Sequence, residues 1–209
     1  MKSIFAKTRI FVALMLYAIA ILPFVSCQKV EDNEEKPSPL AKDWVAVKIG
    51  DSTLSNPMVY SFTPSGQFEA GVILDEIMLK QIQQIFSDLT VSEEGQKMLA
   101  SFAVGDLLVQ FAGSYTVSFD KSGTAGTITM VMDPQKCSGE VNEENSVESG
   151  DFHDLQEDRM MIVGYSIDSE GNRTGIDIEM KSASSLGIEI GKHHLLKTLT
   201  DSVTWKEEF

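Results

Sequence analysis

Apolar and polar residues alternate along most of the chain after residue 43, with the period of two that is typical of strands half-buried in a sheet. In residues 58–70, Tyr60 and Phe62 alternate with polar residues, and the pattern resumes at Phe68 after a Pro-Ser-Gly turn. Strands are expected at 43–49, 58–63, 67–72, 107–111, 113–119, 126–132, 161–167, 175–180, 187–190, 195–199 and 203–206. Short strands joined by tight turns predict a mainly β fold, an antiparallel meander that forms a barrel or a sandwich.

The period changes in one internal stretch, residues 75–104. Between Asp75 and Leu89 the apolar residues recur every three or four positions, which predicts an amphipathic helix. Thr90-Val91-Ser92-Glu93 has the spacing of a capping box and predicts a second helix through about Val104. This two-helix insertion is expected either to cover the core of the sheet or to form a lid over a ligand cavity.

The first 26 residues have the organisation of an export signal. Lys2, Lys7 and Arg9 precede an apolar run, Ile10–Val25, whose 16 residues are fewer than the roughly 20 needed to cross a bilayer. Phe24-Val25-Ser26-Cys27 resembles the lipobox of bacterial lipoproteins, which implies diacylglycerol attachment at Cys27 and cleavage just before it. The alternative is a secretory signal that happens to contain a cysteine. Two or three acyl chains would anchor the protein stably without a membrane-spanning segment.

Residues 27–42 are predicted to form a flexible, acidic tether. They hold four acidic residues and two prolines and almost no apolar side chain, so they cannot build a core. An acidic run soon after the lipidated cysteine resembles the surface-export signal of Bacteroidetes-type lipoproteins. This resemblance implies an outer-membrane lipoprotein exposed at the cell surface; the alternative is a tether that faces the periplasm.

The charge of the chain argues against one class of partner. The formal net charge is −14, and without the three basic residues of the signal, 14 Lys and Arg remain against 31 Asp and Glu. A surface this acidic repels phosphates, because nucleic-acid binding requires clustered Lys and Arg. We therefore expect no nucleic-acid partner.

Several segments of residues 43–209, which we expect to form the folded domain, resemble the lipocalin-like lipoproteins of Bacteroidetes. The resemblance is carried by Trp44, by Tyr60–Phe68 with its Phe-x-x-x-Gly-x-Phe hairpin, by the Gly-x-Tyr strand at Gly113–Val117, and by Leu199-Thr200 followed by Trp205-Lys206. It covers about half of the domain and consists of structural residues. It implies a lipocalin-like fold and does not specify a ligand.

Candidate chemistry is sparse. An acidic stretch at 139–158 could bind Ca²⁺ or supply a glycosidase pair, but it lacks EF-hand spacing and is better explained as a solvated loop. Its acidic residues are Glu140, Glu143, Glu144, Glu148, Asp151, Asp154, Glu157 and Asp158. His193 and His194 are neighbours in a predicted strand, so they point to opposite faces and cannot share an ion. His153 is isolated, and Cys137 has no activating residue nearby in the sequence.

Methionines are frequent among the predicted strands. Met130, Met132, Met160, Met161 and Met180 could line a malleable apolar pocket, although filling of the core is the more common role. The sequence contains no Gly-x-Ser-x-Gly elbow, phosphate-binding glycine loop or His-Glu-x-x-His motif, so it predicts no catalytic residue, metal site or cofactor.

These observations lead to a functional hypothesis. We expect a non-enzymatic, lipid-anchored protein of the cell envelope whose β-domain binds a small apolar ligand or a glycan. The alternative is a structural or accessory module that binds another envelope protein. A carbohydrate hydrolase is the third possibility, since carboxylates are abundant.

Overall fold

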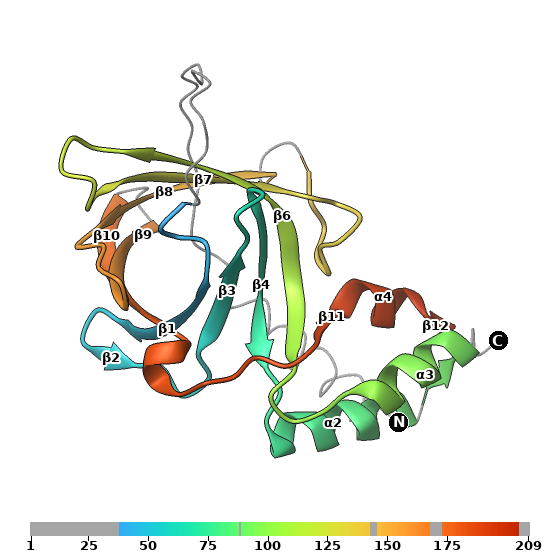
Figure 1. The fold of residues 1–209 in the computed structure, drawn as a ribbon. Coiled ribbons are helices and arrows are strands. Elements are labelled where there is room, and N and C mark those ends of the chain that lie inside the picture. Colours follow the sequence, from blue (N-terminus) through green and yellow to red (C-terminus); the bar gives the residue numbers. More distant parts are fainter. Residues whose placement is uncertain (1–37, 88, 143–145, 168–172, 205–209) are drawn as a thin grey trace.

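A computed structural model describes residues 38–87, 89–142, 146–167 and 173–204 (Figure 1). Eight antiparallel strands form a closed barrel, in which each strand pairs with the next along the chain and the last pairs with the first. These strands are β1 (Asp43–Ile49), β3 (Met58–Phe62), β4 (Gln67–Ile73), β6 (Leu107–Phe119), β7 (Gly126–Met132), β8 (Val147–His153), β9 (Arg159–Ile167) and β10 (Arg173–Ser182). The short β2 (Ser52–Thr53) extends the edge of β1. The predicted lipocalin-like barrel is confirmed.

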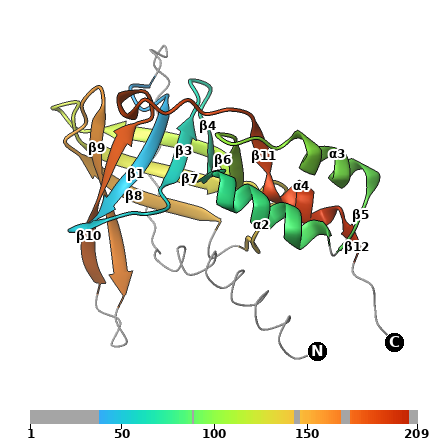
Figure 2. The same ribbon diagram turned by 90° about the horizontal axis from the view of Figure 1, so that it is seen from below.

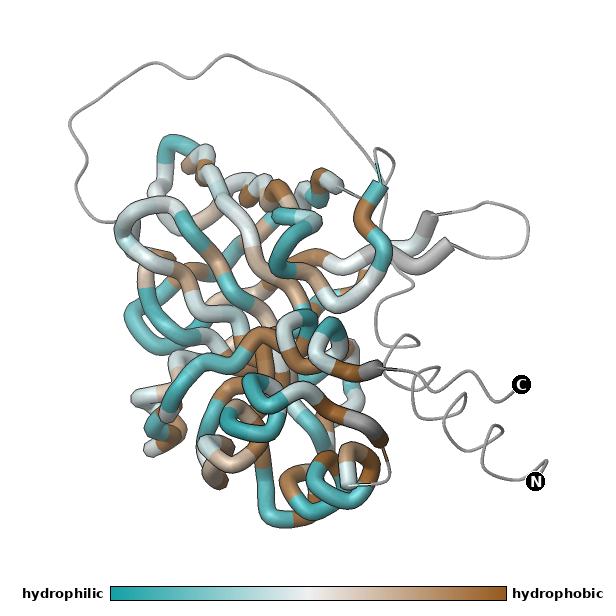
Figure 3. Tube along the Cα trace, turned by 90° about the vertical axis from the view of Figure 1, so that its right-hand side faces the viewer, coloured by the Kyte–Doolittle hydropathy of each residue, from teal (hydrophilic) through white to brown (hydrophobic). Residues whose placement is uncertain are grey.

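Alternation along the strands separates an inner from an outer face. On β1, Trp44 and Ala46 belong to the cluster of side chains inside the barrel, whereas Val45 and Val47 belong to a second cluster on the outside. This division is the reason that the period of two is visible in the sequence. Figure 3 shows the resulting alternation of apolar and polar residues along the trace.

One end of the barrel, where β1 begins, is closed by the chain that precedes β1. Leu40 is completely buried among the inner side chains, and its carbonyl accepts a hydrogen bond of 3.0 Å from Nε1 of Trp44. Tyr115 donates to the carbonyl of Thr63 at 2.9 Å and packs edge-on against Phe62. The fold therefore begins by Leu40, before the expected boundary at residue 43, and Leu40 belongs to the core rather than to a tether.

The chain after β10 crosses the outside of the barrel. It forms a short 3₁₀-helix, η1 (Ser184–Leu186), and then β11 (His193–Leu195), which pairs in parallel with the start of β6. The side chains of Ala183, Ile188 and Ile190 pack against the outward-facing residues of the barrel. The predicted strand at 187–190 is not formed; this stretch is an extended cover for the outer face.

A helical layer lies on one side of the barrel, beyond the ends of β4 and β6 (Figures 1 and 2). It contains α2 (Glu76–Ser87), α3 (Glu93–Ser101) and α4 (Leu196–Asp201), with a two-stranded sheet of β5 (Thr90–Val91) and β12 (Val203–Thr204). Ile82, Phe102 and Leu199 pack onto Leu74 and Leu108 at the ends of the barrel strands. The two-helix insertion is confirmed, and these contacts fit the covering of a core better than a lid.

Two local predictions in this layer were wrong. The second helix begins at Glu93, and its N-cap is Ser92, whose hydroxyl accepts from the backbone N–H of Gly95 at 3.2 Å; Thr90 lies in β5 instead. Residues 196–201 form α4 rather than part of a strand, because the spacing of Leu196 and Leu199 places both on the helical cluster. Trp205 lies outside the described residues.

The acidic stretch at 139–158 contains a strand that the sequence did not predict. Val147–His153 forms β8, which pairs with β7 and β9 and is required to close the barrel. A single solvated loop was therefore the wrong interpretation for this stretch. Its inward positions are Glu148, Gly150 and Phe152, and only the last of these is a large apolar residue, so the usual alternation is hidden.

Candidate functional site

The half of the barrel interior next to the closed end is filled by side chains. Trp44, Phe68 and Phe152 are each less than 2% exposed, and they belong to the same buried cluster as Leu40. Met160 and Met180, which are paired across β9 and β10, complete this packing. No space for a ligand is evident among these residues, so a candidate site has to lie nearer the other end.

The half of the interior away from the closed end is lined by inward-facing side chains that stay partly accessible. We call this region the open lumen, and its lining consists of Tyr60, Phe111, Met130, Glu148, Ile162 and Ile178. The apolar members pack against the filled core. Five of the six are apolar or aromatic, so the lumen offers a mainly apolar surface.

Strand register places Glu148 among these inward-facing residues. Glu148 is opposite Met130 on β7, two residues before Gly150, which is opposite the buried Ile128. Directly opposed residues of an antiparallel pair lie on the same face of the sheet. The side chain of Glu148 therefore points into the barrel, although its neighbours Val147 and Ser149 point outward.

Tyr60 lies on the opposite wall of the open lumen. In the closed ring of eight strands, β3 and β8 are four strands apart in either direction. Burial, and after it the negative charge of Glu148, raise the pKa of Tyr60 to about 12. The charge of Glu148 thus acts on the phenol of Tyr60 from the other wall.

The side-chain oxygens of Tyr60 and Glu148 have no hydrogen-bond partner in the described part of the chain. No hydrogen bond to Tyr60 or Glu148 is found there. Among the described residues, the one sealed side-chain nitrogen or oxygen without a hydrogen-bond partner is Nε of Arg159, which lies 3.4 Å from Oε1 of Glu179. The oxygens of Tyr60 and Glu148 must therefore reach accessible space inside the barrel. Burial raises the pKa of the Glu148 carboxyl above its ordinary value.

Loop residues narrow the entrance of the open lumen. Leu54, from the connection between β1 and β3, and Val141, from the connection between β7 and β8, pack against the inner cluster. Cys137 also lies there and is 1% exposed. Burial raises the pKa of its thiol, which contacts the carbonyl of Ala112 at 3.6 Å. These features describe a packing residue rather than an activated nucleophile.

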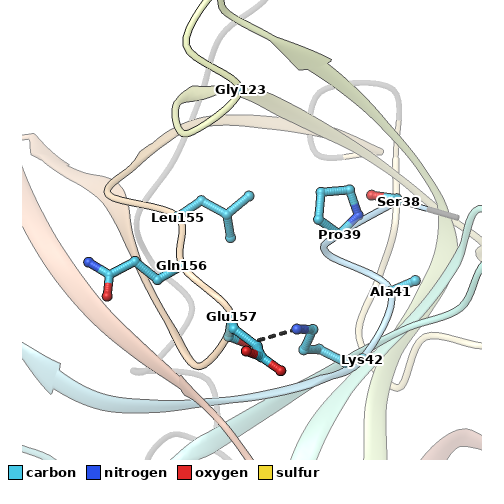
Figure 4. A pocket seen from close by; sticks show the side chains of 8 residues that line it. All are labelled: Ser38, Pro39, Ala41, Lys42, Gly123, Leu155, Gln156 and Glu157. Carbon is cyan, nitrogen blue, oxygen red and sulfur yellow. Dashed lines mark hydrogen bonds between the residues drawn. The ribbon is translucent and has the colours of Figure 1, made fainter. Parts of the chain in front are cut away.

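Two surface pockets lie outside the open lumen. The larger, about 460 Å³, is an open groove at the closed end between the chain at 38–42, Gly123 and Leu155–Glu157 (Figure 4). Nζ of Lys42 donates to the carbonyl of Glu157 across it at 2.7 Å. The smaller, about 270 Å³, lies on the outer face of β3, β4 and β6. The side chains gathered at the larger groove hold no arrangement of acid, base and nucleophile.

The two adjacent histidines point to opposite sides, as predicted. His193 lines the smaller pocket, where its Nδ1 is 2.5 Å from Oε2 of Glu69, and this hydrogen bond raises the pKa of His193. Nε2 of His194 is buried and lies 2.8 Å from Oδ2 of Asp106. Asp106 also accepts from the backbone N–H of Lys192, so this pair fastens β11 to the start of β6.

The remaining candidate residues are dispersed. His153 is not isolated, because its ring nitrogens contact Asp154 at 3.1 Å and Asp177 at 3.5 Å. Asp151 points outward and accepts from Thr127 at 2.9 Å. In the described residues no group of three or more His, Cys, Asp or Glu is arranged to hold a metal ion. Glu143, Glu144 and the expected lipidation site Cys27 lie outside those residues.

Four of the five methionines face the barrel interior. Met160 and Met180 are buried in the filled core, Met130 lines the open lumen, and Met132 is buried inside the barrel at the far end of β7. Met161 belongs to the outer face, where its sulfur is 3.6 Å from the guanidinium of Arg159. Most of these residues fill the core, and one contributes to the candidate site.

The sequence did not single out Tyr60 and Glu148 as a pair. Glu148 was one of many acidic residues in its stretch, and Tyr60 was one position in an alternating strand. The signal was the spacing of Glu148, Gly150 and Phe152, which puts a carboxylate on the same face as a buried aromatic residue. The link to Tyr60 requires the order of the strands around the barrel.

Comparisons with known proteins add little to this description. No family model matches the chain, and no curated protein matches it. A similar solved structure is the complex of bovine odorant-binding protein with a selenium-containing odorant. The identity is 11%, the match covers 78% of this chain and 90% of that chain, and the TM-score is 0.28. The description of the fold therefore depends on the strand pairing in this chain.

The described residues also contain no helix that is long and apolar enough to cross a membrane.

Proposed function

We propose that this protein binds a small, largely apolar ligand in the open lumen of its barrel. The observation that carries the proposal is the partial accessibility of inward-facing side chains from six strands, Tyr60, Phe111, Met130, Glu148, Ile162 and Ile178. Small-molecule sites are typically concave and apolar, with a few polar groups that orient the ligand. The open lumen has this composition.

A glycan is a poorer match to the same surface. Sugars carry a hydroxyl on most carbons, and each hydroxyl that leaves water needs a hydrogen-bond partner. Tyr60 and Glu148 are the two polar members of this lining, whereas its other members offer no donor or acceptor. The lining therefore supports an apolar ligand with one polar end.

The proposal includes a lipid anchor at Cys27. The lipobox-like Phe24-Val25-Ser26-Cys27 and the basic residues before it support export and acylation. We expect metabolic labelling with an alkyne-tagged fatty acid to mark the chain in a bacterium that processes lipoproteins, and a Cys27→Ala variant to stay unlabelled. Equal labelling of the variant would contradict the anchor and would leave the ligand-binding proposal untouched.

Ligand binding can be tested with a fluorescent probe and two matched variants. N-phenyl-1-naphthylamine emits strongly only in apolar surroundings. Gly150 faces the interior, and a Cβ built there meets Ile162 at 3.7 Å, an ordinary contact. The main chain therefore leaves room for a Cβ at this position, and a leucine there adds its side chain to the inner face beside Glu148. Val147 lies on the same strand, points outward and is 48% exposed, so Val147→Leu is the control.

The expected result is saturable probe binding by the purified full chain and by Val147→Leu, and its loss in Gly150→Leu. Absence of saturable binding, or equal binding by Gly150→Leu, would overturn the proposal. The second outcome would place the probe on the outer surface, where exposed apolar side chains such as Ile77 and Val104 could hold it. A role as an interaction module would then be the better account.

A further inference from the structure

The open lumen contains one carboxylate that no described residue compensates. Glu148 has no hydrogen-bond donor and no cation beside it in the described part of the chain. Partial removal of a carboxylate from water without a partner is unfavourable, and the same burial raises the pKa of the Glu148 carboxyl. Structural needs at this position would be met better by an apolar residue, since Met130 and Gly150 surround it on the inner face.

We propose that Glu148 binds the cationic nitrogen of the ligand, with Tyr60 on the opposite wall as a second hydrogen-bonding group. The inference depends on the proposed function and specifies its ligand class: an apolar molecule that carries an amine or another protonated nitrogen at one end. The apolar part lies against Met130, Ile162 and Ile178, which share the same lining.

The chemistry of the pair distinguishes among possible polar ends. A carboxylate of the ligand, as in a fatty acid, would lie close to the negative charge of Glu148 and would be repelled. A neutral hydroxyl could donate one hydrogen bond but would leave the charge of Glu148 without a counter-ion. An ammonium group supplies both the positive charge and several donors, and charge-assisted hydrogen bonds are about twice as strong as neutral ones.

Tyr60 adds a second recognition element. Its raised pKa of about 12 keeps the phenol protonated at physiological pH, so its oxygen accepts from an ammonium and its ring offers an electron-rich face. Phe111 lies on the same lining and contributes a further aromatic surface. A cation held between a carboxylate and aromatic rings has favourable contacts on more than one side.

Competition against the bound probe tests this inference. Three ten-carbon competitors, decylamine, decanol and decanoic acid, share one apolar chain and differ in the polar end. We expect decylamine to displace N-phenyl-1-naphthylamine at a concentration at least about tenfold lower than decanol does, a difference of about 1.4 kcal/mol. Decanoic acid should be the weakest of the three.

Matched variants separate the lumen carboxylate from the acidity of the whole protein. Glu148→Gln removes the negative charge inside the barrel with little change of shape. Asp151→Asn removes a negative charge from the outer face of the same strand. The preference for decylamine should disappear in Glu148→Gln and persist in Asp151→Asn, which should bind the probe normally; each displacement is compared with that variant's own affinity for the probe. Tyr60→Phe should weaken decylamine more than decanol.

The possible outcomes distinguish the inference from the function on which it depends. Probe binding combined with equal displacement by all three competitors, or a preference for decylamine that survives in Glu148→Gln, would overturn the inference and leave the proposed function intact. Failure of the wild-type protein to bind the probe would overturn both.

Discussion

Leu40 provides a stringent test of how the barrel is closed. Its side chain is completely buried among the inner residues, and its carbonyl receives the indole N–H of Trp44 at 3.0 Å. Leu40→Ala removes three carbons, and burial of each contributes about 0.8 kcal/mol, or about 2.4 kcal/mol together. The cavity left behind adds to this loss, so the free energy of unfolding should fall by about 3–5 kcal/mol.

The assay is equilibrium unfolding of the full chain in urea, followed by circular dichroism. The midpoint should move to lower urea with little change in the slope, because the substitution alters the stability and not the surface exposed on unfolding. Leu186→Ala serves as the control. Leu186 in η1 is 38% exposed, so this substitution should lower the free energy of unfolding by less than about 1 kcal/mol.

A loss below about 1 kcal/mol in Leu40→Ala, equal to that of the control, would refute the argument. It would mean that the chain at 38–42 is a solvated tether and that the aromatic layer around Trp44 closes the barrel without it. The same result would move the start of the folded domain back to residue 43.

Two further predictions concern the outer face and the strands. A Cβ on Gly113 would lie 1.9 Å from the carbonyl oxygen of Val131, so Gly113→Ala should lower the free energy of unfolding by about 2 kcal/mol or more. Gly139 has open space around it, so the control Gly139→Ala should change that free energy by less than about 0.5 kcal/mol. Urea unfolding measures both changes. The hydrogen bond that Nδ1 of His193 donates to the carboxylate of Glu69 raises the pKa of His193 above 6.5. The stabilisation from this pair is therefore complete below pH 6.5 and is lost as the pH rises through the raised value. In His193→Gln the melting temperature should therefore fall less steeply with rising pH than it does in the wild-type protein. The same pH dependence in both proteins would contradict this prediction.

The sequence predicted most of the barrel because most inward positions are apolar. In the first half of β4 and in most of β7 the residues that fill the interior alternate with polar residues on the outer face, so the period of two is directly visible. The helix at 76–87 was equally clear, since its apolar residues recur on one face. These elements form where local pattern and tertiary packing agree.

β8 was missed because its inward positions serve a different purpose. Glu148 and Gly150 break the apolar alternation, and the many acidic residues around them suggested a solvated loop. The strand is held by its two neighbours, β7 and β9, which the sequence of this stretch does not reveal. The proposed polar group of the site and the reason for the wrong prediction are thus the same residue, Glu148.

The ends of the fold were also difficult to predict. Leu40 is a single apolar residue after two prolines, and one residue establishes no period. At the other end, α4 carries β-branched threonines beside its leucines, and the packing of Leu199 against Leu74 decides its conformation. In both places a contact with a distant part of the chain determines the structure.

The most direct test of the central claim is a crystal structure of the protein with 10-bromodecylamine, in which the anomalous scattering of bromine locates the apolar end. We expect the amine beside Glu148 and Tyr60 and the bromine inside the barrel, within the lining formed by Met130, Ile162 and Ile178. A bromine peak on the outer face, or an interior fully occupied by protein side chains between β3 and β8, would contradict the claim that the open lumen binds ligand.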